Sequence, residues 1–180
     1  MALVIDGTGD ITGLVTGALP ANVIGTGAIL QVVQTVKTSY FTFSGGSWLD
    51  VTGFSVSITP SSASSKILVS FSASATQSAT SGYYAINLRL VRDSTTLYVG
   101  DASGNGVQAS AQIGAPHSYY GNTLTGQYLD SPATTSSITY KLQAYGESGG
   151  STLGLGGSYT TSAVYSARSP SQITVMEIAG

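Results

Sequence analysis

The sequence predicts an all-β protein: an antiparallel two-sheet sandwich of jelly-roll type, preceded by an extended N-terminal arm. Apolar residues alternate with polar ones over many short runs, glycine and proline separate these runs, and no segment has apolar residues at helical spacing. Only 8% of the residues are charged and 42% are hydrophobic, a composition that favours a folded core over disorder. At 180 residues, one globular domain is expected.

The clearest pattern comprises two runs, 51–58 and 66–75. In each run a period of two places the large apolar side chains on one face and the hydroxyls on the other. A link rich in proline and serine joins the runs. We therefore expect them to be neighbouring strands of one antiparallel sheet.

The N-terminal segment 1–27 is expected to form a separate arm. Its apolar residues are spaced by glycines, which are entropically costly to order, and it has too few large side chains for a core of its own. A linker would be more polar, so we expect an arm that is ordered by contact with a partner chain, with a frayed leader as the alternative. The candidate docking residues are Leu3, Val4, Ile5, Ile11, Leu14 and Val15.

Residues 28–180 are expected to form the sandwich. Turn residues such as Gly45-Gly46 and Asp93-Ser94 separate its strands. The glycine-rich stretch Gly146–Gly157 is expected to be a long mobile loop or a loosely packed edge. The predicted strands are Ile29–Val36, Ser39–Phe43, Trp48–Ser57, Lys66–Ala75, Ala85–Arg92, Thr96–Val99, Val107–Ile113, Gly126–Leu129, Ile138–Tyr145, Ser162–Ala167 and Gln172–Ile178.

Composition argues against several classes of function. The net charge is −2 and the six basic residues are scattered, so no basic stripe for nucleic acid exists. Without cysteine there is neither a disulfide nor a thiolate metal site. The first residues lack the basic region of a secretory signal, and no apolar run approaches the ~18 residues of a membrane helix. We expect no nucleic-acid or membrane partner, and assembly in a cytoplasm.

The sequence contains no recognisable catalytic set. The single histidine, His117, stands in a loop-like context, where an exposed histidine is expected and a binding or catalytic role is the alternative. The acids are dispersed singly, and turn or cap roles account for Asp50, Asp93, Asp101 and Asp130 better than the facing carboxylates of a glycosidase do. We expect neither an enzyme nor a cofactor.

One segment, Asp101–Gly106, matches the first half of a calcium-binding loop. Gln112 stands where that loop requires a bidentate glutamate, and flanking helices are not predicted. A turn is therefore expected here rather than a metal site.

Two consecutive tyrosine pairs stand beside glycine in predicted loops: Tyr83-Tyr84 and Tyr119-Tyr120. A tyrosine ring combines a flat apolar surface with a hydroxyl and loses little entropy on contact. Packing across a subunit interface or over sheet edges is the expected role. Outward contact with a receptor, together with His117, is the alternative.

Five segments match a known family in order along the chain. They are GTGAILQVVQTVKT (25–38), WLDVTGFSVSITPSSASSKILV (48–69), LRLVRDSTTLYVGD (88–101), YLDSPATTSSITYKLQA (128–144) and QITVMEIAG (172–180). On these segments the chain resembles virion surface proteins of tailed bacteriophages, frequent in phages of cyanobacteria, that form tips of tail fibres or tailspikes and capsid decoration (cement) proteins. The resemblance implies a jelly-roll sandwich, a homotrimer and a place on the virion surface.

Within this family, fibre proteins usually carry a long N-terminal anchor, whereas about 27 residues precede the predicted sandwich here. We therefore expect a decoration protein on the outer capsid surface, whose arms bind the major capsid protein. Each aliphatic side chain buried there would contribute roughly 1.5–3 kcal/mol, and several arms per trimer would raise the effective concentration. The second hypothesis is a receptor-binding tip that recognises a host surface glycan, and the third is a carbohydrate-active enzyme or lectin.

Overall fold

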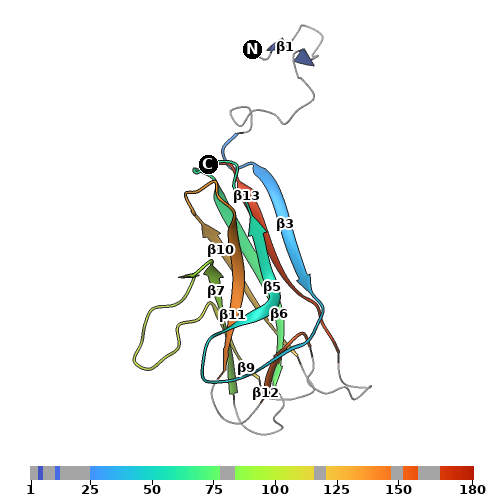
Figure 1. Cartoon of the computed structure of the whole chain (residues 1–180), viewed down its shortest axis with the longest axis vertical. Coiled ribbons are helices and arrows are strands. Elements are labelled where there is room, and N and C mark those ends of the chain that lie inside the picture. Colours follow the sequence, from blue (N-terminus) through green and yellow to red (C-terminus); the bar gives the residue numbers. More distant parts are fainter. Residues whose placement is uncertain are drawn as a thin grey trace.

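Two antiparallel β-sheets pack face to face in the computed structural model (Figure 1). The structure describes residues 4–5, 11–12, 25–77, 84–115, 121–146, 152–157 and 167–180. The strands are β1 (Val4–Ile5), β2 (Ile11–Thr12), β3 (Ile29–Lys37), β4 (Phe41–Ser44), β5 (Leu49–Ile58), β6 (Lys66–Gln77), β7 (Tyr84–Arg92), β8 (Thr95–Leu97), β9 (Ala111–Ala115), β10 (Asn122–Asp130), β11 (Ile138–Gly146), β12 (Thr152–Leu155) and β13 (Ser171–Ile178).

In the six-stranded sheet, β10, β6, β13 and β3 lie side by side. β12 pairs with β6 beyond the end of β13, and β4 pairs with β12. The long strand β6 sets this arrangement, because β10 pairs with one of its edges while β13 and then β12 pair with the other. The five-stranded sheet has the order β5, β11, β7, with β9 and β8 sharing the outer edge of β7.

Successive main strands change from one sheet to the other along the chain, except that β7 and β9 follow one another in the same sheet. β3, β6, β10 and β13 belong to one sheet, and β5, β7, β9 and β11 to the other. This order is the double Greek key of a jelly roll. The predicted fold class, an antiparallel two-sheet sandwich of jelly-roll type, is confirmed.

The expectation that the runs 51–58 and 66–75 are neighbours in one sheet is wrong. The first run lies in β5, which pairs with β11, and the second lies in β6, which pairs with β10, β12 and β13. Both runs have one apolar face, and that pattern fits either sheet. The link 59–65 is long enough to cross the ~10 Å between packed sheets.

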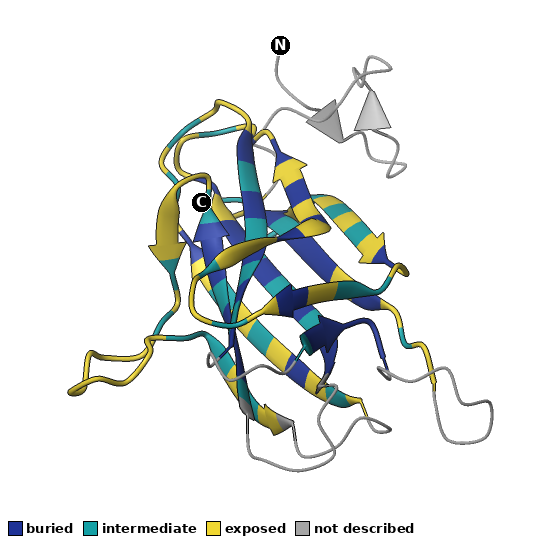
Figure 2. Ribbon diagram, turned by 60° about the horizontal axis from the view of Figure 1, so that its bottom comes forward, coloured by how far each residue is buried: buried dark blue, intermediate teal, exposed yellow. Residues whose placement is uncertain are grey.

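The inner faces of the two sheets form one core. Figure 2 shows the alternation of buried and exposed residues along the strands, and β11 is buried at every second position. The core includes Phe54, Val56, Ile67, Val69, Phe71, Ile86, Leu88, Leu90, Tyr140, Leu142, Leu153, Leu155, Ile173 and Val175. Gly126 faces Phe71 so closely that a Cβ there would collide with the ring, which explains a glycine in mid-strand.

The expectation for Gly146–Gly157 is wrong at residues 152–155. These residues form β12, which lies between β6 and β4, and Leu153 and Leu155 are fully buried. A four-residue strand that contains a glycine carries too short a pattern to be recognised in sequence. Its partner strands supply the stability that it lacks locally.

Two other predicted strands do not coincide with strands of the described structure. The strand expected at Val107–Ile113 is shifted, because Ala111–Ala115 forms β9 and residues 107–110 are in no strand. Most of the strand expected at Ser162–Ala167 lies outside the described residues, and Ala167 is in no strand.

The two ends of the sandwich differ in what they carry. At one end, here called the arm end, the Gly27 amide donates to the Ala179 carbonyl and the Ala179 amide donates to the Ala28 carbonyl. The chain thus enters β3 beside its own C-terminus, as Figure 1 shows. At the opposite end, the far end, β6 finishes and β7 and β10 begin, with Tyr84 paired to Ala115.

Candidate functional site

The outer surface of the six-stranded sheet carries a face without charge. Its outward side chains form three rows across β3, β13, β6 and β10. We call it the neutral face: Val32, Met176, Leu68 and Leu129; Gln34, Thr174, Ser70 and Gln127; Val36, Gln172, Ser72 and Thr125.

Apolar groups are concentrated in the first row of the neutral face. Val32 is 55% exposed and Leu129 45% exposed, with Leu68 and Met176 half-buried between them. Val36, in the third row, is 51% exposed. In the middle row, Gln34 Nε2 donates to Thr174 Oγ1 at 2.8 Å. A contiguous apolar row rimmed by hydroxyls and amides is typical of a surface that contacts another protein.

The outer surface of the five-stranded sheet has a different character. Asp50 on β5 accepts hydrogen bonds from Lys141 Nζ at 2.8 Å and Gln143 Nε2 at 2.7 Å, both on β11. Gln143 Oε1 in turn accepts from Arg89 Nε on β7, at 2.8 Å. The bonds from Lys141 and Gln143 hold the pKa of the Asp50 carboxyl below its ordinary value, so this carboxylate is charged at neutral pH.

Aromatic rings complete this surface. The ring centroids of Trp48 and Tyr145 are 5.4 Å apart, and the Arg89 guanidinium lies 4.3 Å from the Trp48 ring centroid. Burial against these groups lowers the pKa of Arg89, and the Asp50 charge partly opposes that effect. We call Trp48, Asp50, Arg89, Lys141, Gln143 and Tyr145 the Trp48 cluster.

A third group of polar side chains lies between the sheets. Asp130, at the end of β10, accepts hydrogen bonds at 2.6 Å from Arg92 Nη1 on β7 and from the Tyr140 hydroxyl on β11. Burial, reinforced by Asp130, raises the pKa of Tyr140, which therefore stays a hydrogen-bond donor. The arrangement ties the two sheets together and is structural.

A fourth group occupies the arm end. Glu177, on β13, is fully buried, and its carboxylate accepts from the Ser61 amide and hydroxyl, the Ser65 hydroxyl and Gln31 Nε2 at 2.6–2.7 Å. Burial would raise the pKa of Glu177, but these hydrogen bonds outweigh it and lower the pKa below the ordinary value. The carboxylate thus fastens the link after β5 to the last strand.

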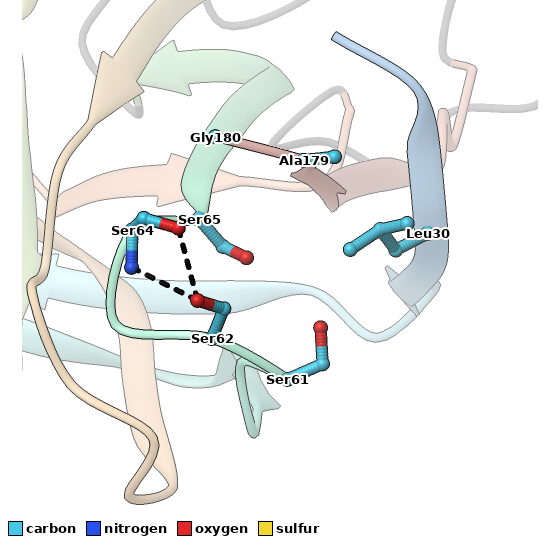
Figure 3. A pocket seen from close by; sticks show the side chains of 7 residues that line it. All are labelled: Leu30, Ser61, Ser62, Ser64, Ser65, Ala179 and Gly180. Carbon is cyan, nitrogen blue, oxygen red and sulfur yellow. Dashed lines mark hydrogen bonds between the residues drawn. The ribbon is translucent and has the colours of Figure 1, made fainter. Parts of the chain in front are cut away.

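A small hollow opens beside this carboxylate (Figure 3). Serines of the link after β5 line one side, and Leu30 with the C-terminal residues lines the other. Its volume of about 110 Å³ is well below the ~300 Å³ of a typical small-molecule site. Since the Glu177 oxygens are already bonded, the hollow suits a few water molecules rather than a substrate. Its lining residues are Leu30, Ser61, Ser62, Ser64, Ser65, Ala179 and Gly180.

The candidate receptor residues are only partly visible. Tyr84, expected in a loop, is the first residue of β7, and Tyr83, His117, Tyr119 and Tyr120 lie outside the described residues. The described strand residues nearest to them, Tyr84, Ala115 and Asn122, all lie at the far end.

The candidate docking residues of the arm are also partly described. Val4 and Ile5 form β1, which pairs antiparallel with Ile11 and Thr12 of β2. Leu3, Leu14 and Val15 lie outside the described residues.

Two of the acids assigned to turns or caps have other roles. Asp50 is a strand residue of β5 and Asp130 is buried between the sheets, so the expectation for them is wrong: each charge is neutralised by a residue distant in sequence. Asp93 does occupy the turn between β7 and β8, where its φ is 52° and its carboxylate accepts from the Thr139 amide.

The segment Asp101–Gly106 forms a turn, in which the Gly106 amide donates to the Ser103 carbonyl at 2.9 Å. In the described part of the chain, no group of three or more His, Cys, Asp or Glu side chains is placed to hold a metal ion. Within the same residues, no helix is long and apolar enough to cross a membrane.

Sequence reasoning missed the Trp48 cluster and did not locate the neutral face. The cluster joins residues from three segments whose pairing the sequence does not reveal. The neutral face had a visible signal, namely uncharged residues at every outward position of the runs 29–36, 66–75 and 172–178 after Lys66.

Comparison with known proteins yields distant structural likenesses. No protein-family model and no curated protein sequence matches the chain. The structure is similar to the VP2 subviral particle of infectious bursal disease virus, with a TM-score of 0.39 and 16% identity over 82% of this chain and 41% of that one. It is also similar to a protein in the structure of the Gx strain of that virus, with a TM-score of 0.37 and 12% identity over 85% of this chain and 39% of that one. The chain spans about two fifths of the length of these proteins.

Proposed function

We propose that the chain is a non-enzymatic structural protein of a phage virion: a homotrimeric capsid decoration protein that binds the major capsid protein and projects its sandwich outward. It would assemble in the host cytoplasm and reside on the outer capsid surface. The phage and the trimer come from the resemblance of the five sequence segments, and the jelly-roll topology agrees with them, since viral capsid proteins commonly use this fold.

The neutral face is the observation that carries the proposal. A surface with exposed valines and leucine and no charge is poorly protected against association, and interface cores are depleted of charged residues. Its amides and hydroxyls both donate and accept hydrogen bonds, so an uncharged surface of a second copy is a suitable partner. We assign this face to the contact between subunits of the trimer.

The two ends of the sandwich fit the proposed orientation, in which the arm end docks on the capsid and the far end points away from it. The chain enters at the arm end, beside Ala179, and the strands that border the tyrosine-bearing segments terminate at the far end. A trimer that docks through Leu3, Val4, Ile5, Ile11, Leu14 and Val15 would therefore turn its far end away from the shell.

The test mixes the purified full-length protein with undecorated capsids of its phage and images the particles. Regularly spaced trimers over the shell are expected. Bare shells, with the protein found only at the tail, would contradict the decoration role.

The far end favours a second candidate function, a receptor-binding tip. Tyr84 and Ala115 are paired there, which brings the bordering residues of both tyrosine-bearing segments together. Binding of a host surface glycan by the wild type, lost in Tyr84→Ala and Tyr119→Ala, would support it. The third hypothesis is a carbohydrate-active enzyme or lectin. Asp50 and Asp130 do not support the enzyme, since both carboxylates are engaged in structural ion pairs.

A further inference from the structure

The Trp48 cluster has the composition and the fixed geometry of a ligand site. Trp48 and Tyr145 are both half-buried, so neither residue is wholly covered by the described part of the chain. Their contact with each other and with Arg89 holds them in place. Indole and phenol rings offer an apolar surface with a polar edge, which suits ligands that have both characters.

The polar groups of the cluster are held in one chain of hydrogen bonds. Lys141 and Gln143 both donate to Asp50, and Gln143 accepts from Arg89 Nε. Because Nε makes the bond within the protein, the two terminal nitrogens of Arg89 have no hydrogen-bond partner in the part of the chain that the structure describes. A guanidinium fixed in this way presents its paired N–H groups to an external acceptor.

A buried polar atom lies next to the cluster. Asn87 is between Tyr145 and Gln112 across the sheet, two residues from Arg89, and is only 2% exposed. Among the described residues, its Oδ1 has no hydrogen-bond donor. A buried acceptor without a donor is unusual and requires an external one, such as a hydroxyl or a water molecule.

These features match the chemistry of a sugar. The C–H face of a pyranose packs on an indole, its hydroxyls donate to carboxylate and amide oxygens, and a sugar carboxylate accepts both N–H groups of an arginine. Lys141 and Arg89 outnumber Asp50, so the cluster is positive by one charge. We propose that the Trp48 cluster binds a saccharide and prefers one that carries a carboxylate.

This site lies on the other sheet from the neutral face, and it includes none of the candidate receptor residues. It can therefore be tested on the isolated protein, whatever its place in the virion. The outcome of the capsid experiment does not affect this test.

Tryptophan fluorescence monitors this site specifically, because Trp48 is the one tryptophan of the chain. The experiment titrates full-length protein with tetragalacturonate and, in parallel, with neutral cellotetraose, and follows tryptophan fluorescence. A saturable change with tetragalacturonate, at an affinity at least about tenfold higher than for cellotetraose, is expected. No saturable change with either oligosaccharide would overturn the proposal, and equal affinities would overturn its preference for a carboxylate.

Matched variants locate the binding. Arg89→Lys keeps the charge but loses the forked pair of donors, and Gln143→Ala releases Arg89; each is expected to weaken tetragalacturonate binding about tenfold or more. Ser57→Ala is the control, since the exposed Ser57 hydroxyl is also bonded across strands, to Thr139, but lies outside both the Trp48 cluster and the neutral face. Its affinity is expected to equal that of the wild type. If Arg89→Lys and Gln143→Ala also bind as the wild type does, the site is not at Trp48.

Discussion

On the outside of β3, β13, β6 and β10, the neutral face holds valine, leucine, methionine, serine, threonine and glutamine. On the outside of β5, β11 and β7, Asp50, Lys141 and Arg89 lie within one network. The inner faces of the two sheets are alike in that both contribute apolar side chains to one core. Packing of the core therefore does not account for the difference, and we attribute it to what each outer face contacts.

Charge introduced into the neutral face should have the largest effect. Val36→Glu would place a carboxylate in the proposed trimer contact, where it loses its hydration, and we expect association at least about a hundredfold weaker. Sedimentation analysis of the oligomeric state measures it. Ser55→Glu, on an exposed residue of β5, is the control and should leave the oligomer intact. A Val36→Glu protein that remains trimeric would remove this face from the contact.

Removing the Arg92 charge, which pairs with Asp130 between the sheets, should have the next largest effect, a loss of stability. Arg92→Ala leaves Asp130 buried, with the Tyr140 hydroxyl as its remaining hydrogen-bond partner among the described residues. We expect a loss of about 3–5 kcal/mol in the free energy of unfolding, measured with denaturant. A loss below about 1 kcal/mol would show that this ion pair does not hold the sheets together.

Removing the Glu177 charge at the arm end should lower stability by an amount that depends on pH. Because the folded protein lowers the pKa of Glu177, the unfolded chain binds the proton more tightly, and stability falls as the pH decreases through the folded pKa. Glu177→Gln should lose about 1–3 kcal/mol at neutral pH and show a flatter decline below the ordinary carboxyl pKa. Unfolding curves from pH 7 downwards measure both. A decline as steep as in the wild type would assign the acid sensitivity to another group.

Charge removed from the exposed surface should have the smallest effect. Asp50 is 55% exposed in its side chain, so Lys141→Ala should change the free energy of unfolding by at most about 1 kcal/mol, and less at high salt. The same denaturant measurement, compared with Arg92→Ala, contrasts an exposed pair with a buried one. Equal losses would mean that burial does not distinguish them.

The sequence by itself determined the period-two pattern, and with it most of the longer strands, their inward faces and the absence of charge on the neutral face. These properties are local, because each depends on residues adjacent along one strand. The fold class followed, since many short amphipathic strands without helices between them favour burial of their apolar faces between two sheets.

Only the tertiary structure decided which strands are neighbours. It placed β5 and β6 in opposite sheets, inserted β12 between β6 and β4, and gave Asp50, Asp130 and Glu177 their partners. Each of these contacts joins residues distant along the chain, and a pattern of alternation is the same whichever strand lies beside it. The Trp48 cluster belongs to this second kind, because its side chains meet only after β5, β11 and β7 have paired.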